Sequence, residues 1–229
     1  MTIGFRVLAR QRKVEAGIVQ RYRDLPVANV SDVMNRMSAG GPQLRPLHAG
    51  GVLAGPALTV KTRPGDNLMI HKALLMAEPG DVIVVDGGGD LTSALMGELM
   101  LSHAIKVGVA GVVIHGAVRD SAWIKAHDFP VFAEGITHRG PYKDGPGEIN
   151  VPVALAGMVI EPGDLVIGDD DGILCVPFDE AMRIEGLARA KKEAEAKTLA
   201  NTQAGKLDPK TWVDETLARL GCGGIAPRK

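Results

Sequence analysis

A change of pattern near residue 150 constrains the fold of this chain more than any other feature. Before it, apolar, β-branched runs within 78–90, 108–116 and 129–135 alternate with segments of helical spacing. After it, residues 149–177 contain short β-rich runs separated by Gly and Asp turns, with no helical segment between them. Alternation followed by hairpins predicts stacked sheets flanked by helices, and it argues against a doubly wound nucleotide-binding fold.

Helical patterns are expected on both sides of the first strands. Residues 14–25 and 30–37 have helical spacing, and Ser31 is placed to act as the N-cap of the second helix. Residues 51–63 read as one or two strands, and a helix over 66–77 follows, with Asp66 as its cap.

Further helices are expected in the middle and at the end of the chain. A helical pattern over 92–107 is interrupted by a glycine, and a short helix is expected over 120–128. A long Ala/Lys/Glu helix follows Phe178, and a last helix is capped by Asp208 with Pro209 at its first position. With 229 residues and an ordinary globular composition, the chain is expected to form a single α/β domain over 1–229.

The composition excludes several classes of partner. The net charge is −1 and no basic block occurs, so nucleic acid is not expected as a ligand. The opening residues lack the apolar stretch of a signal peptide, and no run approaches the length of a membrane span. The two cysteines, Cys175 and Cys222, lie far apart and read as reduced thiols, which predicts a cytoplasmic protein.

Three motifs are better explained by structure than by ligand binding. The acidic run 169–171 before Gly172 lacks the terminal Glu of a calcium loop, so it predicts a hairpin turn. The glycines in 87–90 have neither the Lys-Ser/Thr of a P-loop nor GxGxxG spacing. No histidine pair has zinc-ligand spacing, and His115 is expected to form a hydrogen bond at a strand end.

Two other positions combine residue types that can carry chemistry. Gly97 breaks a helical pattern; if a helix restarts there, its first amides form an anion site, although such a glycine also fits close packing. Arg119 and Asp120 end a buried strand and offer a carboxylate-binding fork and a hard oxygen ligand for Mg²⁺ or Mn²⁺. A structural ion pair remains the alternative for them. Glu98 could lie at the same end of the helix-strand unit as Arg119 and Asp120, or it could be a solvated surface group.

Five segments in order give the chain a resemblance to the RraA-like family, and within it to the class II pyruvate aldolases. They are DGGGDLTSALMGELM, GVVIHGAVRD, FPVFAEG, GPGEINVPV and GDLVIGDDDGILCVP. The family signature is an acidic residue, twenty intervening residues and then Arg-Asp. Glu98, residues 99–118, Arg119 and Asp120 reproduce it. These aldolases act on 4-hydroxy-4-methyl-2-oxoglutarate and 4-carboxy-4-hydroxy-2-oxoadipate.

The resemblance implies a fold and an assembly. The fold is the swivelling β/β/α type, an α-ββ-α sandwich, with a core over about residues 25–180 and a helical extension over 178–229. The assembly is a homotrimer or homohexamer with sites between subunits. An acidic side chain from the neighbouring subunit's C-terminal helix completes the aldolase site, and Glu193 and Glu195 are candidates for it.

The resemblance also implies roles for individual residues. Asp120 would contact the divalent metal, Mg²⁺ or Mn²⁺, and Arg119 would hold the pyruvyl part of the substrate. Glu98 would position a metal-bound water. The substrate carboxylate would be bound by the backbone of Gly97, Glu98, Leu99 and Met100. The chain departs from the family at Glu98, where the best-studied aldolases carry Asp, and at Trp123, where members often carry an acidic residue.

The function implied is metal-dependent retro-aldol cleavage of 4-hydroxy-2-oxo di- or tricarboxylic acids, which releases pyruvate. The same enolate chemistry would allow oxaloacetate decarboxylation. One alternative is a non-catalytic RraA-type regulator that binds a ribonuclease, although such relatives lack the Asp of Arg-Asp. The other is a demethylmenaquinone methyltransferase, which would need a glycine loop after its first strand and continuing β-α alternation.

Overall fold

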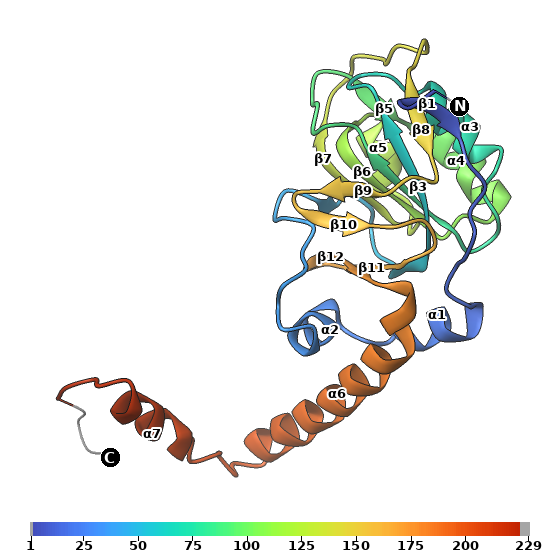
Figure 1. Cartoon of the computed structure of the whole chain (residues 1–229). Helices are drawn as coiled ribbons and strands as arrows, with labels where there is room; N and C mark the ends of the chain where they lie inside the picture. Colours follow the sequence, from blue (N-terminus) through green and yellow to red (C-terminus); the bar gives the residue numbers. More distant parts are fainter. Residues whose placement is uncertain (1, 225–229) are drawn as a thin grey trace. The chain divides into compact units, whose positions relative to one another are not determined.

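Strands and helices alternate through the first part of the computed structural model, which describes residues 2–224, and strands alone follow from β8 to β12 (Figure 1). The strands are β1 (Phe5–Val7), β2 (Arg45–Pro46), β3 (Leu53–Thr62), β4 (Val82–Asp86), β5 (Ala94–Met96), β6 (Gly111–Val118), β7 (Val131–Ile136), β8 (Gly147–Ile149), β9 (Val153–Leu155), β10 (Met158–Ile160), β11 (Leu165–Asp169) and β12 (Gly172–Val176). The helices are α1 (Ala16–Tyr22), α2 (Val27–Val33), α3 (Leu68–Leu74), α4 (Glu98–Val107), α5 (Ser121–Lys125), a 3₁₀ turn (Phe178–Glu180), α6 (Ala181–Gln203) and α7 (Thr211–Arg219).

The two-residue period of β4 divides its side chains between two cores. Ile83 and Val85 are fully buried in a core that includes residues of α3, α4 and α5. Val82 and Val84 are fully buried in a second core, together with residues of β9, β10, β11 and β12. Because successive side chains of a strand point to opposite faces, β4 lies between a helical layer and a layer of strands.

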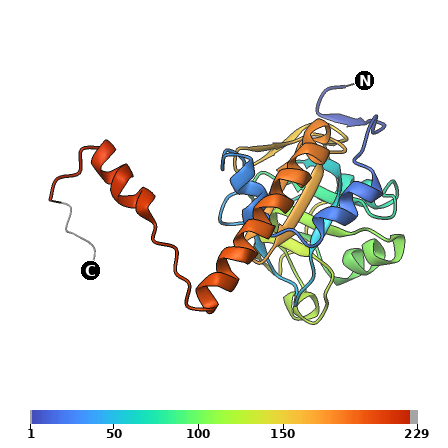
Figure 2. The same cartoon turned by 90° about the horizontal axis from the view of Figure 1, so that it is seen from below.

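The strand β11 divides its side chains in the same way. Val166 packs in the core between the strands, whereas Leu165 and Ile167 pack in a third core with residues of α1, α2 and α6. Figure 2 shows α1 and α2 on the same face of the strands as the first turns of α6. The layers therefore run helix, sheet, sheet, helix, which confirms the predicted α/β sandwich.

One long strand connects the two sheet layers. The main sheet has the order β1-β8-β3-β4-β6-β7-β2. The first residues of β3, Leu53 to Pro56, pair antiparallel with β11, and the residues that follow, Ala57 to Lys61, pair parallel with β4. The strands β3, β4, β6 and β7 run parallel, so their carboxyl ends meet at one edge of the sheet.

The helical pattern expected over 92–107 is wrong in its first part. Residues Ala94–Met96 form β5, which pairs parallel with β6, and the helix begins only at Glu98. All three residues of β5 are buried. Pairing with a central strand outweighs the local helical spacing there, because it satisfies backbone groups that would otherwise be buried without partners.

Two predicted caps are also displaced. Ser31 lies inside α2, and Pro26 precedes its first residue in an extended conformation (ψ 137°). Near the end of the chain, Lys210 has φ +47°, so α7 begins after it instead of at Pro209. Asp208 still accepts a hydrogen bond from the Lys210 amide (2.9 Å).

One cap is displaced by a single residue, and one local expectation is confirmed. Asn67 is the N-cap of α3, and Asp66, which precedes it, accepts a hydrogen bond through Oδ1 from the amide of Leu68, the first residue of α3 (2.9 Å). The acidic run at 169–171 lies at the turn of the β11–β12 hairpin, where Asp169 pairs with Gly172. Among the described residues, no helix is both long and apolar enough to cross a bilayer.

The chain divides into two units, Met1–Arg189 and Ala190–Lys229. In the first, the start of α6 is fixed to α1: Tyr22 donates to the Ala181 carbonyl (2.7 Å), and Arg189 bonds to Asp24 (3.1 Å). The second contains the rest of α6 and α7, with large apolar side chains exposed at Leu199, Leu207, Trp212 and Leu220. The single domain over 1–229 stays a prediction.

Candidate active site

Pairing between β5 and β6 brings the two predicted motifs together. Met96, the last residue of β5, pairs with Val118, the last residue of β6. The amide of Arg119 donates to the Met96 carbonyl (3.0 Å). The residues that follow each strand, Gly97 on one side and Arg119 on the other, are therefore neighbours although they are far apart in the sequence.

Gly97 is required by the closeness of this approach. Its backbone is extended (φ −158°), so its conformation alone does not demand glycine. A Cβ at this position would clash with Asp120 Oδ2 and lie 2.8 Å from Arg119 Cγ. Gly97 is therefore a packing glycine, as one interpretation of the sequence holds, and the residues it packs against are the candidate site residues Arg119 and Asp120.

The backbone at Asp120 turns its side chain toward Gly97. Asp120 has φ +61°, a left-handed conformation that is uncommon outside glycine and that occurs at functional sites. Its Oδ2 accepts a hydrogen bond from the Glu98 amide (2.8 Å) and lies 3.7 Å from Arg119 Nε. The Arg119 and Asp120 side chains remain 43% and 39% exposed, so their ion pair contributes little to stability.

The first turn of α4 uses some of its amides within the chain. Glu98 donates to Asp120, and Met100 donates to the Gly97 carbonyl (3.1 Å). The Leu99 amide has no hydrogen-bond partner among residues 2–224, and the Leu99 side chain is 80% exposed. One donor at the helix N-terminus thus remains open to an anion.

A hollow of about 420 Å³ lies beside Asp120. Its lining adds three polar side chains that the sequence analysis did not single out, from Ser121, Thr137 and His138. Arg119 also borders a narrow recess, which is lined partly by Asn67 and Pro141. Ser121 directly follows Asp120 in the sequence. The other four residues come from separate elements, and no local spacing relates them to Arg119, so sequence patterns had no means of finding them.

Asn67 is held firmly in the wall of this recess. It is buried, and its Nδ2 donates to the Leu95 carbonyl (3.0 Å) and contacts Met100 Sδ (3.3 Å). Its amide donates to the Tyr142 carbonyl (3.0 Å). The segment that contains Pro141 is therefore fastened to the start of α3.

The donor set suits a hydrated hard cation better than a closed transition-metal site. Asp120 uses one carboxylate oxygen for the Glu98 amide, and its other oxygen has no partner in the described part of the chain. Mg²⁺ retains several waters and needs only one or two protein carboxylates. Within residues 2–224, no three His, Cys, Asp or Glu side chains are grouped to hold a metal. The residues present thus fit Mg²⁺ or Mn²⁺ bound through Asp120.

The amides of the glycine loop at 87–89 bond within the protein instead of forming a phosphate cradle. The amides of Gly87 and Gly89 donate to the His115 carbonyl (3.1 and 3.2 Å), and the Gly88 amide donates to Asp86 Oδ1 (3.1 Å). His115 also bonds through Nδ1 to Asp86 Oδ1 (3.2 Å), so the expected hydrogen bond forms, although the residue lies within β6 and not at its end. With these three amides engaged, the loop has few donors for a nucleotide.

The side chains of the other predicted residues make no contact with the corner formed by Gly97, Arg119 and Asp120. The side chain of Glu98 is exposed at the first position of α4. Trp123 stacks on His127, with ring centroids 3.9 Å apart. Glu193 and Glu195 belong to α6 in the second unit.

Comparison with known proteins places this geometry in a family. Residues 27–175 match the model of the RraA-like family, described as Aldolase/RraA. The chain belongs to the RraA-like family. The matched range includes Gly97, Arg119 and Asp120, so the corner described above lies within the part that this RraA-like chain shares with its family.

Two relatives carry the name "putative 4-hydroxy-4-methyl-2-oxoglutarate aldolase". The protein from Halalkalibacterium halodurans is 39% identical over 181 residues, which is 79% of this chain and 85% of that protein. The protein from Burkholderia multivorans is 42% identical over 133 residues, which is 58% of this chain and 80% of the relative.

Solved structures with this fold carry other names. The RNA-processing inhibitor RraA from Thermus thermophilis is 32% identical with a TM-score of 0.63, and the match covers 67% of this chain and 93% of that one. A protein from Geobacillus kaustophilus named S-adenosylmethionine: 2-dimethylmenaquinone methyltransferase is 33% identical with a TM-score of 0.63, over 67% and 95% of the two chains.

Proposed function

We propose that this protein is a divalent-metal-dependent aldolase that cleaves 4-hydroxy-2-oxo di- or tricarboxylic acids and releases pyruvate. The observation that carries the proposal is the corner in which Gly97, Arg119 and Asp120 meet beside an open hollow. The names of the two relatives support the same reaction.

In this proposal each group has one task. Asp120 holds Mg²⁺ or Mn²⁺, which when bound acts as a Lewis acid on the keto acid. Arg119 binds the pyruvyl half and stabilises the charge that develops as the bond between C3 and C4 breaks and its electrons form the enolate of pyruvate. The free Leu99 amide at the start of α4 binds the carboxylate.

Glu98 assists the transfer of the 4-hydroxyl proton to a water molecule, so that C4 leaves as the second carbonyl product, and a proton is returned to C3 to give pyruvate. Its exposed position at the start of α4 leaves the carboxylate free to reach the hollow when substrate is present. The same enolate would form when oxaloacetate loses carbon dioxide, so we propose decarboxylation as a second activity. We also propose a trimer or hexamer with the site between subunits.

The test is pyruvate release from 4-hydroxy-4-methyl-2-oxoglutarate, related 4-hydroxy-2-oxo acids and oxaloacetate, with Mg²⁺ and with EDTA. We expect activity only with the metal, and we expect Asp120→Ala to abolish it while the circular dichroism spectrum stays unchanged. Asp170→Ala, which changes an exposed aspartate at the hairpin turn, is the matched control and should retain full activity. Near-full activity of Asp120→Ala would refute the metal role.

Arg119→Lys separates charge from geometry. An ammonium cannot reproduce the planar fork, so kcat/KM should fall by more than about tenfold, which is about 1.4 kcal/mol of transition-state stabilisation. A smaller loss would contradict a transition-state role for Arg119.

A regulator that binds a ribonuclease is the second candidate, favoured by the likeness to the RNA-processing inhibitor. Capture of a ribonuclease by a chain that neither binds metal nor releases pyruvate would favour it. The methyltransferase reading is supported less, because the glycine loop follows a middle strand and its amides bond to His115 and Asp86. A measurable affinity for S-adenosylmethionine would revive it.

A further inference from the structure

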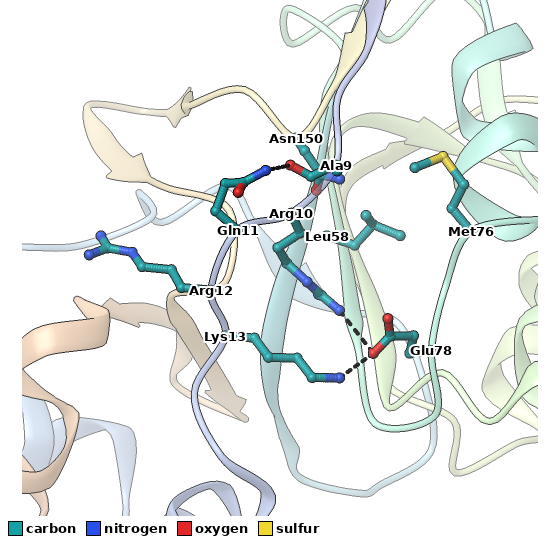
Figure 3. Close-up of a pocket in the computed structure, with 9 residues that line it drawn as sticks. All are labelled: Ala9, Arg10, Gln11, Arg12, Lys13, Leu58, Met76, Glu78 and Asn150. Atoms are coloured by element: carbon teal, nitrogen blue, oxygen red, sulfur yellow. Dashed lines mark hydrogen bonds and ion pairs between the residues drawn. The ribbon is translucent and has the colours of Figure 1, made fainter.

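The hollow drawn in Figure 3 offers few free groups to a ligand. It has a volume of about 480 Å³, and the charged side chains in its lining are paired within the chain. Figure 3 shows Arg10 and Lys13 both directed at Glu78. Arg10 Nη1 also lies 2.8 Å from Asp81 Oδ1, and Arg12 forms two ion pairs of its own. The positive charges of this hollow are therefore already neutralised.

The hollow of about 420 Å³ beside Asp120 differs, because its polar side chains have no partners. Ser121, Thr137 and His138 line it, and none of their side chains forms a hydrogen bond or an ion pair within residues 2–224. A hydroxyl and an imidazole ring each carry at least one hydrogen that can be donated. The volume lies in the range of about 300–1,000 Å³ that is typical of small-molecule sites. The hollow thus combines room for a ligand with donors that the fold leaves free.

Strand pairing places these donors beside the candidate active site. Ile136, the last residue of β7, pairs with Val118, the last residue of β6. The amide of Thr137 donates to the Val118 carbonyl (3.0 Å). The residues that follow β7 therefore lie next to Arg119 and Asp120, which follow β6.

Arg119 connects this hollow to the start of α4. Within residues 2–224, it alone lines both the hollow and the recess, and Leu99, whose amide is free, also lines the recess. Adjacent strands lie about 4.8 Å apart, and the three carbon–carbon bonds from C2 to C5 of a 4-hydroxy-2-oxo acid span about 4 Å. A substrate with its pyruvyl half at Arg119 can therefore extend its far end over the end of β7.

We propose that the C5 carboxylate of the substrate binds in this hollow and that His138 and Thr137 determine the specificity for it. The His138 ring N–H and the Thr137 hydroxyl donate to the carboxylate oxygens, and Ser121 supplies a third donor. Ala122 and Ile136 line the rest of the hollow and suit an apolar substituent on C4. This proposal rests on the proposed aldolase function and assigns the recognition of the second half of the substrate.

The test compares pyruvate release from two substrates that differ only at C5. 4-Hydroxy-2-oxoglutarate carries a carboxylate there and leaves glyoxylate as its second product, whereas 4-hydroxy-2-oxopentanoate carries a methyl group and leaves acetaldehyde. With Mg²⁺, we expect the full-length protein to prefer the dicarboxylate by about 50-fold or more in kcat/KM, because a methyl group cannot accept hydrogen bonds from the donors in the hollow.

Variants of the two donors distinguish a role in specificity from a role in stability. His138→Ala should lower the preference about tenfold, through a reduced kcat/KM for 4-hydroxy-2-oxoglutarate alone, and Thr137→Val should lower it about threefold. His138→Gln keeps an N–H donor and should recover most of the preference. A merely structural effect would reduce kcat/KM for both substrates by the same factor.

Arg139→Gln is the control for positive charge in the neighbourhood of the site. Arg139 follows His138 in the sequence and is exposed, but it lines neither the hollow nor the recess. Its Nη2 contacts the Tyr142 hydroxyl (3.4 Å). This variant should keep the full preference for the dicarboxylate.

Three results would overturn this proposal and leave the aldolase function standing. One is equal kcat/KM for the two substrates in the wild-type protein. Another is a preference that stays unchanged in His138→Ala, or a loss there that is equal for both substrates. The third is a loss of preference in Arg139→Gln that matches the loss in His138→Ala, which would indicate diffuse charge. A protein that releases no pyruvate from any 4-hydroxy-2-oxo acid would instead overturn the proposed function, and this proposal with it.

Discussion

At the scale of single residues, the candidate site depends on one missing side chain. The Glu98 amide reaches Asp120 Oδ2 only because position 97 carries no Cβ. The left-handed backbone at Asp120 completes the contact by turning the carboxylate back toward α4. These contacts of the backbone and the Asp120 carboxylate thus fix the position of the Arg119 backbone, from which its side chain extends.

Gly97→Ala should therefore reduce activity without unfolding the protein. The added methyl displaces Asp120 and Arg119, and a displacement of about 1 Å in a catalytic group can reduce kcat/KM about 100-fold. Gly186→Ala is the control, because a Cβ there meets nothing within 4 Å and activity should be unchanged. Steady-state kinetics and urea denaturation of both variants check this. Full activity of Gly97→Ala would contradict the proposed geometry.

At the scale of elements, a buried aspartate connects α3 to the segment that borders the site. Asp66 is fully buried, and its Oδ2 accepts hydrogen bonds from the amides of Asp144 (2.7 Å) and Gly145 (2.9 Å). Its Oδ1 accepts from Leu68 at the start of α3. The segment with Pro141, which lines the recess beside Arg119, is held through these bonds.

Replacing this carboxylate should destabilise the fold strongly. Asp66→Ala leaves three amides without their acceptor, so the free energy of unfolding should fall by about 3 kcal/mol or more. Asp144→Ala, an exposed aspartate in the same segment, should change it by less than about 0.5 kcal/mol. Urea denaturation followed by circular dichroism measures both. Equal effects of the two substitutions would show that the Asp66 contacts do not carry this stability.

The elements that could be predicted from the sequence are those with strong local signals. The β-branched runs of β4 and β6 and the hairpin at 169–172 are where the pattern places them. The strand Ala94–Met96 was missed because its signal lies in its partner, β6. The site divides in the same way. Arg119 and Asp120 are adjacent in the sequence and could be recognised there, whereas Asn67 and His138 reach the site only through tertiary structure.

At the scale of the whole molecule, the core between the two sheets holds the layers together. Phe132 of β7 is fully buried there, and Gly168 of β11 leaves room for its ring, since a Cβ at 168 would lie 2.8 Å from Phe132 Cζ. The two sheets can approach closely at this point because one contributes an aromatic ring and the other no side chain.

Phe132→Ala should therefore lower the free energy of unfolding by about 3–5 kcal/mol, because it leaves a cavity between the layers. Phe5→Ala removes an equal ring that is 54% exposed in β1, and it should cost about 1 kcal/mol or less. Chemical denaturation of both variants distinguishes them. A loss of less than about 1 kcal/mol for Phe132→Ala would mean that the layers do not depend on this core.

The shared strand β3 has a consequence for dissecting the protein. Its first residues hydrogen-bond to β11 and its later residues to β4, so a chain cut near residue 150 would separate β11 from the strand it pairs with. The N-terminal fragment would expose the edge of β3 that pairs with β11, and the C-terminal fragment would lack the strand on which β11 forms. Such halves would be suited to complementation, regaining structure only when mixed, and neither could serve as an independent module.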